Sequence, residues 1–446
     1  RTWANSTRLV VRDGRFIDCA GMYKGHGDAQ FFANCEFNSS KAQKMSIIDA
    51  NASLMLRNMK AKAIPNGNPW ISYGGNIMAR NLNFIATDAN GAPLLDYKKS
   101  YPKPKAYNEY NNVLLEDCSI SVAGSEIPAL VLIRDCPPAL LTLRRCREAG
   151  GKQIEAVNYL KAVEPEKTLF SPAWEQLPKL EDALGIVFED NHQSIKTALP
   201  TNLEAFRRSA LPLNIEMEEF TMPDLEGRTV IIANTLEELK AALLNAASAE
   251  KPLIKVAGKT FALDEPLELP ENIVIMASGH AMFELKEGVS AFKATSEKLD
   301  IVISGIIVSG GLYTGEFKGS GKVLLDNCHL YDNQGITVTS PDPAKPLLLQ
   351  ISNSTLFTIR GVANQGGKVW ISDTWASNRP VLDNGGFFRN KGELRLRNIV
   401  GVPIVFRDQP NLNWKYGNNI HWVENHGDFF SQDVRYGGEF GGIPAV

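Results

Sequence analysis

The chain has 446 residues, of which 44% are hydrophobic and 22% charged, and at about 100 to 200 residues per domain this length predicts two or three packed units. That composition excludes a disordered or fibrous chain. The 47 basic residues are balanced by 50 acidic ones, so the basic excess of a nucleic-acid-binding protein is missing. No run approaches the roughly 18 consecutive apolar residues that cross a bilayer, so no membrane span is expected.

Cysteine and histidine are both scarce, with six of each. The cysteines are too sparse for a disulfide scaffold and none has CxxC spacing, so we expect mostly buried free thiols. No HExxH motif is present, which argues against a zinc enzyme. The sequence opens Arg1-Thr2-Trp3 without an initiator Met, which we interpret as a mature or trimmed product. We expect a secreted or cell-surface location, the periplasm included.

A short motif recurs in the first third of the chain: two apolar residues, one variable residue, then Asn or Asp. It reads Val10-Val11-Arg12-Asp13, Phe31-Phe32-Ala33-Asn34, Met55-Leu56-Arg57-Asn58, Met78-Ala79-Arg80-Asn81 and Leu114-Leu115-Glu116-Asp117, with a weaker copy at Thr142-Leu143-Arg144-Arg145. Most intervals lie between about 20 and 28 residues, the range of solenoid repeats. Because the strands are short and few amphipathic helices separate them, the pattern predicts an all-β, right-handed parallel β-helix.

The Asn and Asp column has a physical reason in such a fold. Each coil must turn sharply, Asn tolerates the left-handed backbone region, and its amide can bond the neighbouring coil. The alternative is a β-sandwich with Asn-rich turns, which needs antiparallel hairpins with two-residue loops. Few such hairpins are visible in the sequence.

The variable residue of the motif is expected to face solvent, because side chains alternate along a strand. In the first third this position holds Arg12, Ala33, Arg57, Arg80, Glu116 and Arg144. Successive coils lie about 4.8 Å apart, close to the rise of one sugar in an extended polysaccharide. A column of guanidinium groups suits the carboxylates or sulfates of such a chain. The alternative is an ordinary solvated arginine face.

The loop Tyr23-Lys24-Gly25-His26-Gly27-Asp28 gathers groups that lyase chemistry needs. β-Elimination on an acidic sugar requires a neutralised carboxylate and a base such as Lys, Arg, His or Tyr. We take Lys24, His26 and Arg80 as candidate catalytic residues. The alternative is a glycine-rich polar corner without catalysis. Residues 24–37 also resemble the coil of pectin methylesterases in which Gly-Asp-Ala precedes Phe-x-Asn-Cys, although Tyr23 stands near the catalytic Asp of that family.

Aromatic residues crowd the loops between the third and fifth repeats, where the interval stretches to about 36 residues. Trp70 and Tyr73 head this group, followed by Tyr97, Tyr101, Tyr107 and Tyr110. Such an insertion could wall a sugar-binding cleft by ring stacking, so Trp70 and Tyr73 join the candidate substrate-binding residues. The alternative is that the aromatic rings pack against their own stack.

Residues 161–227 are rich in Pro and Glu and are interpreted as an ordered connector with short helices, with a mobile linker as the alternative. The segment 235–246 follows, with a capping box between Thr235 and Glu238 and an apolar stripe, which predicts an amphipathic helix. A strand ending in Gly258-Lys259-Thr260 comes next. This order resembles the N-terminal cap of pectate-lyase-like and chondroitinase-B-like β-helix proteins.

A cap belongs at the start of a β-helix, so the resemblance implies a second stack beginning here. The repeat indeed returns as Val302-Ile303-Ser304-Gly305, Leu324-Leu325-Asp326-Asn327, Gln350-Ile351-Ser352-Asn353, Trp370-Ile371-Ser372-Asp373 and Arg395-Leu396-Arg397-Asn398. We therefore expect a first β-helix over residues 1–160, a connector over 161–227 and a second β-helix over 228–446.

The leading hypothesis is a secreted, carbohydrate-active β-helix protein, namely a polysaccharide lyase acting on an acidic polysaccharide. Ca²⁺ is the one cofactor that this chemistry suggests, and the sequence names no metal ligands. A non-catalytic glycan-binding or adhesion protein is the first alternative, and a glycoside hydrolase is the second. His329, Asp332 and Arg360 in the second stack are rival candidates for the catalytic residues. One fold carries many functions, so the fold does not decide among them.

Overall fold

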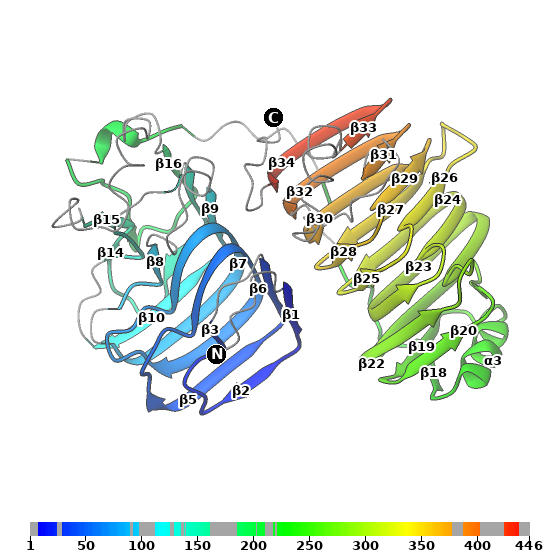
Figure 1. The fold of residues 1–446 in the computed structure, drawn as a ribbon, viewed down its shortest axis with the longest axis horizontal. Helices are drawn as coiled ribbons and strands as arrows, with labels where there is room; N and C mark the ends of the chain where they lie inside the picture. Colours follow the sequence, from blue (N-terminus) through cyan, green and yellow to red (C-terminus); the bar gives the residue numbers. More distant parts are fainter. Residues whose placement is uncertain are drawn as a thin grey trace, which may run out of the picture. The chain divides into compact units, whose positions relative to one another are not determined.

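The computed structural model describes residues 8–24, 29–89, 92–97, 112–124, 129–134, 138, 140–160, 185–201, 203–209, 217–218, 221–376, 387–401 and 423–436. The chain divides into two compact units, Arg1–Pro212 with Arg435–Val446 and Leu213–Val434. Each unit is a stack of short parallel strands (Figure 1). The predicted all-β fold with two parallel β-helix stacks is confirmed.

In the first unit each coil contributes strands to three parallel ladders, which we call A, B and C in chain order. Ladder A contains β1 (Arg8–Arg12), β4 (Ala29–Ala33), β6 (Ile48–Ile64), β7 (Ile71–Ala89), β9 (Asn112–Glu116), β12 (Leu140–Arg144) and β16 (Gly185–Glu189). Ladder B contains β2 (Arg15–Ile17), β5 (Glu36–Ala42), β10 (Ser119–Gly124), β13 (Arg147–Glu148) and the last parts of β6 and β7. Ladder C contains β3 (Tyr23–Lys24), β8 (Leu95–Tyr97), β11 (Val131–Ile133), β15 (Val157–Tyr159) and the first parts of β6 and β7.

The second unit repeats this arrangement. Its ladder A contains β18 (Thr229–Ala233), β19 (Pro252–Ala257), β22 (Asn272–Leu285), β23 (Phe292–Gly310), β24 (Gly315–Asp326), β27 (Leu347–Ser352), β30 (Lys368–Ala376), β32 (Glu393–Gly401) and β34 (Asp428–Tyr436). Ladder B contains β20 (Thr260–Leu263), β25 (His329–Tyr331), β28 (Thr355–Phe357) and parts of β22, β23, β30 and β32. Ladder C contains β21 (Leu267–Glu268), β26 (Ile336–Thr339), β29 (Val362–Gln365), β31 (Phe388–Asn390), β33 (Val423–Asn425) and parts of β23 and β24.

The Asn and Asp column forms the corner between ladders A and B, as predicted. Asp13, Asn34, Asn58 and Asn81 all take the left-handed backbone conformation, with φ between 51° and 56°. The Nδ2 of Asn34 donates to Asp13 Oδ1 (3.1 Å), that of Asn58 to Asn34 Oδ1 (2.9 Å) and that of Asn81 to Asn58 Oδ1 (2.8 Å). The side chains therefore stabilise both the turn in each coil and the contact between coils.

The predicted capping helix is also present, as α3 (Leu236–Ala246) beside the first strands of the second stack (Figure 1). Thr235 Oγ1 accepts from the Glu238 backbone N–H at 3.1 Å, and Glu238 accepts in return from the Asn234 backbone N–H at 2.7 Å. Leu239 and Leu243 are buried in the core of this stack. The helix thus covers the apolar interior of the first coil.

Residues 185–189 differ from the prediction, which placed them in the connector. They form β16, which pairs with β12 and adds a coil to the first stack. Residues 161–184 lie outside the described part of the chain. The connector also contains a short 3-10 helix, η2 (Glu204–Phe206). Two short strands, β14 (Ile154–Glu155) and β17 (Ile195–Lys196), pair separately.

Four of the cysteines, Cys35, Cys118, Cys146 and Cys328, are buried free thiols, whereas Cys19 is an exposed free thiol. This agrees with the expectation of mostly buried thiols. Within the described residues, no helix is both long and apolar enough to cross a membrane.

Candidate functional site

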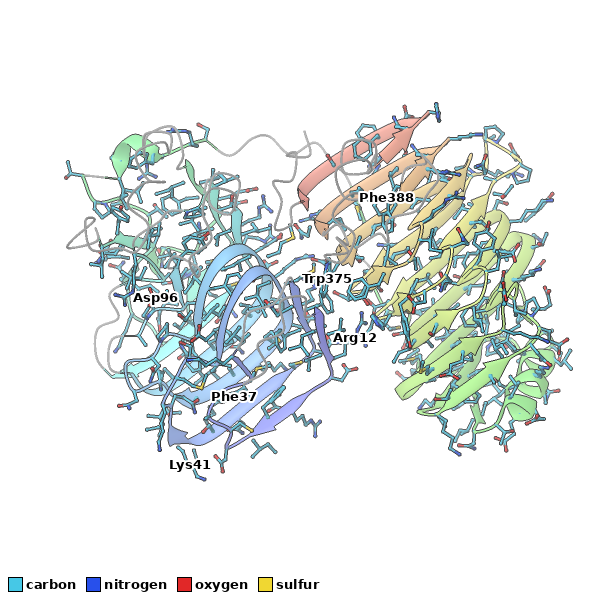
Figure 2. All side chains as sticks on the ribbon, in the orientation of Figure 1. Arg12, Phe37, Lys41, Asp96, Trp375 and Phe388 are labelled. Atoms are coloured by element: carbon cyan, nitrogen blue, oxygen red, sulfur yellow. The ribbon has the colours of Figure 1, made fainter. Side chains whose placement is uncertain are left out.

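The predicted arginine column exists as a column in the first stack. Its members align in register along ladder A in the order Arg12, Ala33, Arg57, Arg80, Glu116, Arg144 and Glu189. The expectation that this position faces solvent is wrong for its central part. Arg80 is 9% exposed, Arg144 3% and Glu116 0%. These side chains lie beside the corner formed by the left-handed residues, where neighbours on successive coils cover one another (Figure 2 labels Arg12 at the start of the column).

Oppositely charged groups alternate along the buried part of this column. The Nε of Arg80 lies 3.8 Å from Glu116 Oε1, and Nη1 of Arg144 lies 3.6 Å from Glu116 Oε2. The Nε of Arg144 also contacts Glu189 Oε2 at 2.7 Å. Arg145 Nη2 forms a further ion pair with Glu116. The guanidinium groups are therefore committed to carboxylates of the chain itself rather than displayed to a glycan.

Arg145 takes the corner position that Asn or Asp holds in the neighbouring coils, with φ 49°. Its guanidinium contacts both oxygens of Asp117, at 2.7 and 2.9 Å. Burial raises the pKa of Asp117, but the hydrogen bonds and charges of Arg145 and Arg80 outweigh it, so that the pKa is lowered. A bidentate ion pair thus compensates a backbone conformation that is costly for a long side chain.

The structure does not bring the predicted catalytic residues together. Lys24 lies in ladder C, where its side chain is 62% exposed and its Nζ is 3.4 Å from Asp49 Oδ2. Arg80 lies at the end of a ladder A strand, on another face of the coil. His26 lies outside the described residues. The two described members, Lys24 and Arg80, therefore lie on different ladders.

Trp70 and Tyr73 are interior residues, so their expected place in a sugar-binding cleft is wrong. Trp70 is 2% exposed and stacks on Phe84 with ring centroids 5.2 Å apart. Tyr73 is fully buried, and its hydroxyl group is 3.2 Å from Gln30 Oε1. Tyr73 shares an inward position of ladder C with Tyr97, so alternation along the strand directs both rings into the core.

The outward column of ladder A in the second stack has a different composition. In register it runs Val230, Leu253, Val274, Val302, Leu324, Gln350, Trp370 and Arg395. The apolar part packs against Met222 and Leu225, and Gln350 Nε2 donates to the Glu218 carbonyl at 2.9 Å. Part of the predicted connector therefore covers this face, up to Gln350.

Beyond Gln350 the column forms a layered aromatic and cationic surface. The Arg395 guanidinium carbon lies 5.3 Å from the centre of the Trp370 ring and 5.1 Å from the centre of the Phe430 ring. Phe430 is 41% exposed, and Trp370 and Arg395 are half-buried. We call these three residues the Trp370 surface. The position considered in the first set of repeats, directly before the corner residue, is Ser372 or Arg397 here. Alternation puts Trp370 and Arg395 on the same outward face, two residues earlier.

Glu393 contacts two residues of the Trp370 surface. Its Oε1 accepts from Trp370 Nε1 at 2.7 Å and lies 2.8 Å from Arg395 Nε. Lys368 Nζ lies 4.0 Å from Glu393 Oε2, with its side chain 42% exposed. Arg397 follows two residues later on the outward side of the same strand. Two basic side chains, Lys368 and Arg395, thus lie near a single carboxylate.

Another group of outward rings lies around the corner, on ladder B of the same unit. His329, Tyr331, Phe357 and Trp375 contact one another there. No three His, Cys, Asp or Glu residues in the described part of the chain are grouped to hold a metal ion.

Comparison with known proteins gives no family. No family model matches the chain, and no curated protein matches it. Among solved structures, sacteLam55A from Streptomyces sp. SirexAA-E is similar at 13% identity, covering 92% of this chain and 80% of that one, with a TM-score of 0.39. A variant of the same protein in complex with glucose is similar at 12% identity over 90% and 80%, with a TM-score of 0.34. At this level of similarity the function has to be inferred from the chain's own residues.

Proposed function

We propose that the chain is a carbohydrate-active β-helix protein that binds an acidic polysaccharide at the Trp370 surface. The observation that carries the proposal is the guanidinium of Arg395 between two aromatic rings on the outer face of successive coils. Aromatic rings pack against the apolar faces of sugars, and Arg pairs with carboxylate or sulfate in a bidentate manner. The coil spacing of about 4.8 Å places these groups at intervals near the rise of one sugar.

Charge favours an acidic rather than a neutral glycan. Lys368, Arg395 and Arg397 lie on one strand pair, and Glu393 lies near the first two. A bound carboxylate or sulfate adds a second partner for these bases. Since they are partly exposed, salt should weaken the interaction. A secreted or cell-surface location, where such polymers occur, is part of the proposal.

β-Elimination is the second candidate function, and the predicted residues do not support it as a group. Lys24 and Arg80 lie on different ladders, and Arg80 is occupied by Glu116 and Asp117. A proton-transfer residue that does share a unit with the Trp370 surface is His329. Lys24 lies in the other unit.

Affinity electrophoresis through gels containing polygalacturonate, alginate or chondroitin sulfate tests the proposed binding, with dextran as the neutral polymer. We expect retardation by at least one acidic polymer, reduced by salt. Trp370→Ala and Arg395→Ala should each reduce it. Lys240→Ala is the matched control, because Lys240 lies in α3 and its loss changes the net charge equally. Equal retardation of Arg395→Ala and Lys240→Ala, or stronger retardation by dextran, would refute the proposal.

A further inference from the structure

The outward side of ladder B in the first stack is open to solvent over successive coils (Figure 1). Phe37, Ala61 and Phe84 of this ladder belong to the interior core, so alternation along the strands directs their neighbours outward. One outward column runs Arg15, Glu36, Lys60, Asn83, Ser119 and Arg147, and the next runs Ile17, Asn38, Lys62, Ile85 and Ser121. All of these residues are exposed except the two serines. We call the two columns the Lys60 face.

The Lys60 face has a net positive charge, because it carries one acid, Glu36, and four bases. The bases are Arg15, Lys60, Lys62 and Arg147. None of the four forms an ion pair with another residue in the described part of the chain. The central arginines of ladder A, in contrast, are paired with a buried carboxylate. The basic groups of the Lys60 face are therefore available to an anionic ligand.

The order of charges along the first column favours anionic groups on alternate sugars. Arg15 and Lys60 stand two coils apart, which corresponds to about 10 Å, near the length of two sugars in an extended chain. Glu36 stands in the coil between them. Its carboxylate would repel an anionic group at that point but accepts hydrogen bonds from the hydroxyl groups of a neutral sugar. Asn83 on the coil after Lys60 offers further polar contacts.

Other polyanions fit the Lys60 face less well. Proteins that bind single-stranded nucleic acids stack the bases on aromatic side chains, and the Lys60 face contains no aromatic residue. An anionic membrane would favour apolar side chains that insert together. Ile17 and Ile85 are 71% and 38% exposed, but they stand three coils apart with Asn38 and Lys62 between them. A linear glycan matches both the separated charges and the polar residues between them.

We propose that the Lys60 face is a second glycan-binding surface, which takes an acidic polysaccharide with one anionic group per disaccharide. This inference rests on the proposed function for its class of ligand and adds a separate surface and a charge spacing. Arg15 and Lys60 pair with the carboxylates or sulfates of alternate sugars. Glu36 accepts from the hydroxyl groups of the sugar between them, and so discriminates against polymers that are charged on every sugar.

Gel retardation by hyaluronan, which has one carboxylate per disaccharide, tests the inference in a Trp370→Ala/Arg395→Ala protein, whose Trp370 surface is removed. This protein should still be retarded. Adding Lys60→Gln and Lys62→Gln should weaken its binding roughly 2- to 30-fold, the range expected for the loss of two exposed ion pairs. Lys251→Gln with Lys259→Gln is the matched control, because both lysines are exposed on the second stack and the net charge changes equally.

Glu36→Gln tests the charge spacing by a gain of binding, which a misfolded variant would not show. Polygalacturonate has a carboxylate on every sugar, so it should retard the Glu36→Gln protein more strongly than the parent. Retardation by hyaluronan should change less, because no anionic group of that polymer faces Glu36. Equal changes on the two polymers would overturn the proposed spacing.

The two surfaces can be judged separately. If Trp370→Ala/Arg395→Ala abolished all retardation by hyaluronan, or if the lysine variants and their control weakened it equally, this inference would be overturned and the proposed binding at the Trp370 surface would stand. If only the lysine variants weakened retardation, the Lys60 face would stand without the Trp370 surface. Binding to phosphatidylserine–phosphatidylcholine vesicles or single-stranded DNA in place of hyaluronan would overturn the inference. A protein that binds none of the acidic polymers would overturn both.

Discussion

Removing the carboxylate of Glu116 should destabilise the first stack far more than removing an exposed charge of the same stack. Glu116 is fully buried and faces the guanidinium groups of Arg80, Arg144 and Arg145. Glu116→Gln keeps the shape of the side chain but leaves the network with one unbalanced positive charge. That charge cannot move into water, because the side chain of Arg144 is only 3% exposed.

The expected loss follows from the partners that remain. Breaking a buried ion pair by removing one member costs about 3–5 kcal/mol. Arg144 keeps Glu189 at 2.7 Å, and Arg80 keeps Asp117 at 3.4 Å. We therefore expect the lower end of that range, about 3 kcal/mol. The same change at Glu155, whose partner Lys196 is as exposed as itself at 46%, should cost about 0–1 kcal/mol.

Hydrogen exchange read by mass spectrometry suits this comparison, because a stack of coils need not unfold in one step. Peptides covering β9 and β12 should exchange faster in Glu116→Gln, by an amount that matches the predicted free energy. Peptides from the second stack provide the internal reference and should not change. If Glu116→Gln exchanged no faster than Glu155→Gln, the buried ion pairs would have no stabilising role and the reasoning would be wrong.

Further changes probe the corners and the charges separately. Asn58→Ala removes two side-chain hydrogen bonds and places Ala at φ 51°, so urea unfolding should show a loss of about 2–4 kcal/mol, of which Asn58→Gly recovers about 1. In Gly319→Ala the new Cβ would meet a backbone oxygen at 1.7 Å, whereas Gly288→Ala, also at positive φ, has open space. Only the former should prevent folding of the second stack, which far-ultraviolet circular dichroism would show. Because the pKa of Asp117 is lowered on folding, its stabilisation is present above the unfolded value of about 3.9 and is lost as pH falls through the folded pKa. Thermal midpoints of Asp117→Asn should therefore fall less on acidification than those of the wild type.

The fold could be predicted because its signal is repeated. A single Asn in a turn does not predict a fold. Asn34, Asn58 and Asn81 at similar intervals predict a corner that recurs in successive coils. The same holds for the capping helix, since Thr235 and Glu238 form a local contact that needs no knowledge of the tertiary structure. Both predictions depend on residues that are close in sequence or related by a fixed period.

The candidate site could be predicted only in part, because exposure is not periodic. Alternation places Arg80 and Arg144 on the outer side of the strand correctly, but it does not show that Glu116 from the coil between them neutralises both. The prediction that Trp70 and Tyr73 line a sugar-binding cleft was wrong for a related reason. A long interval between repeats was interpreted as an outward excursion, whereas these rings fill the interior of the coil.

The two stacks place arginines at different outward positions of ladder A, and the neighbouring coils decide what those arginines contact. Arg80 stands directly before the corner residue Asn81, whereas Arg395 stands three residues before Asn398. In the first stack Glu116 and Glu189 follow Arg80 and Arg144 along the column, so each positive charge has a partner one coil away. In the second stack Arg395 lies between two aromatic rings, and the Glu393 carboxylate lies 2.8 Å from its Nε. Lys368 lies 4.0 Å from the same carboxylate, so an anionic ligand would bring a second negative group to these two bases. On physical grounds, an acidic glycan is therefore expected at the Trp370 surface of the second stack. It is not expected at the arginine column of the first stack, which the sequence analysis favoured.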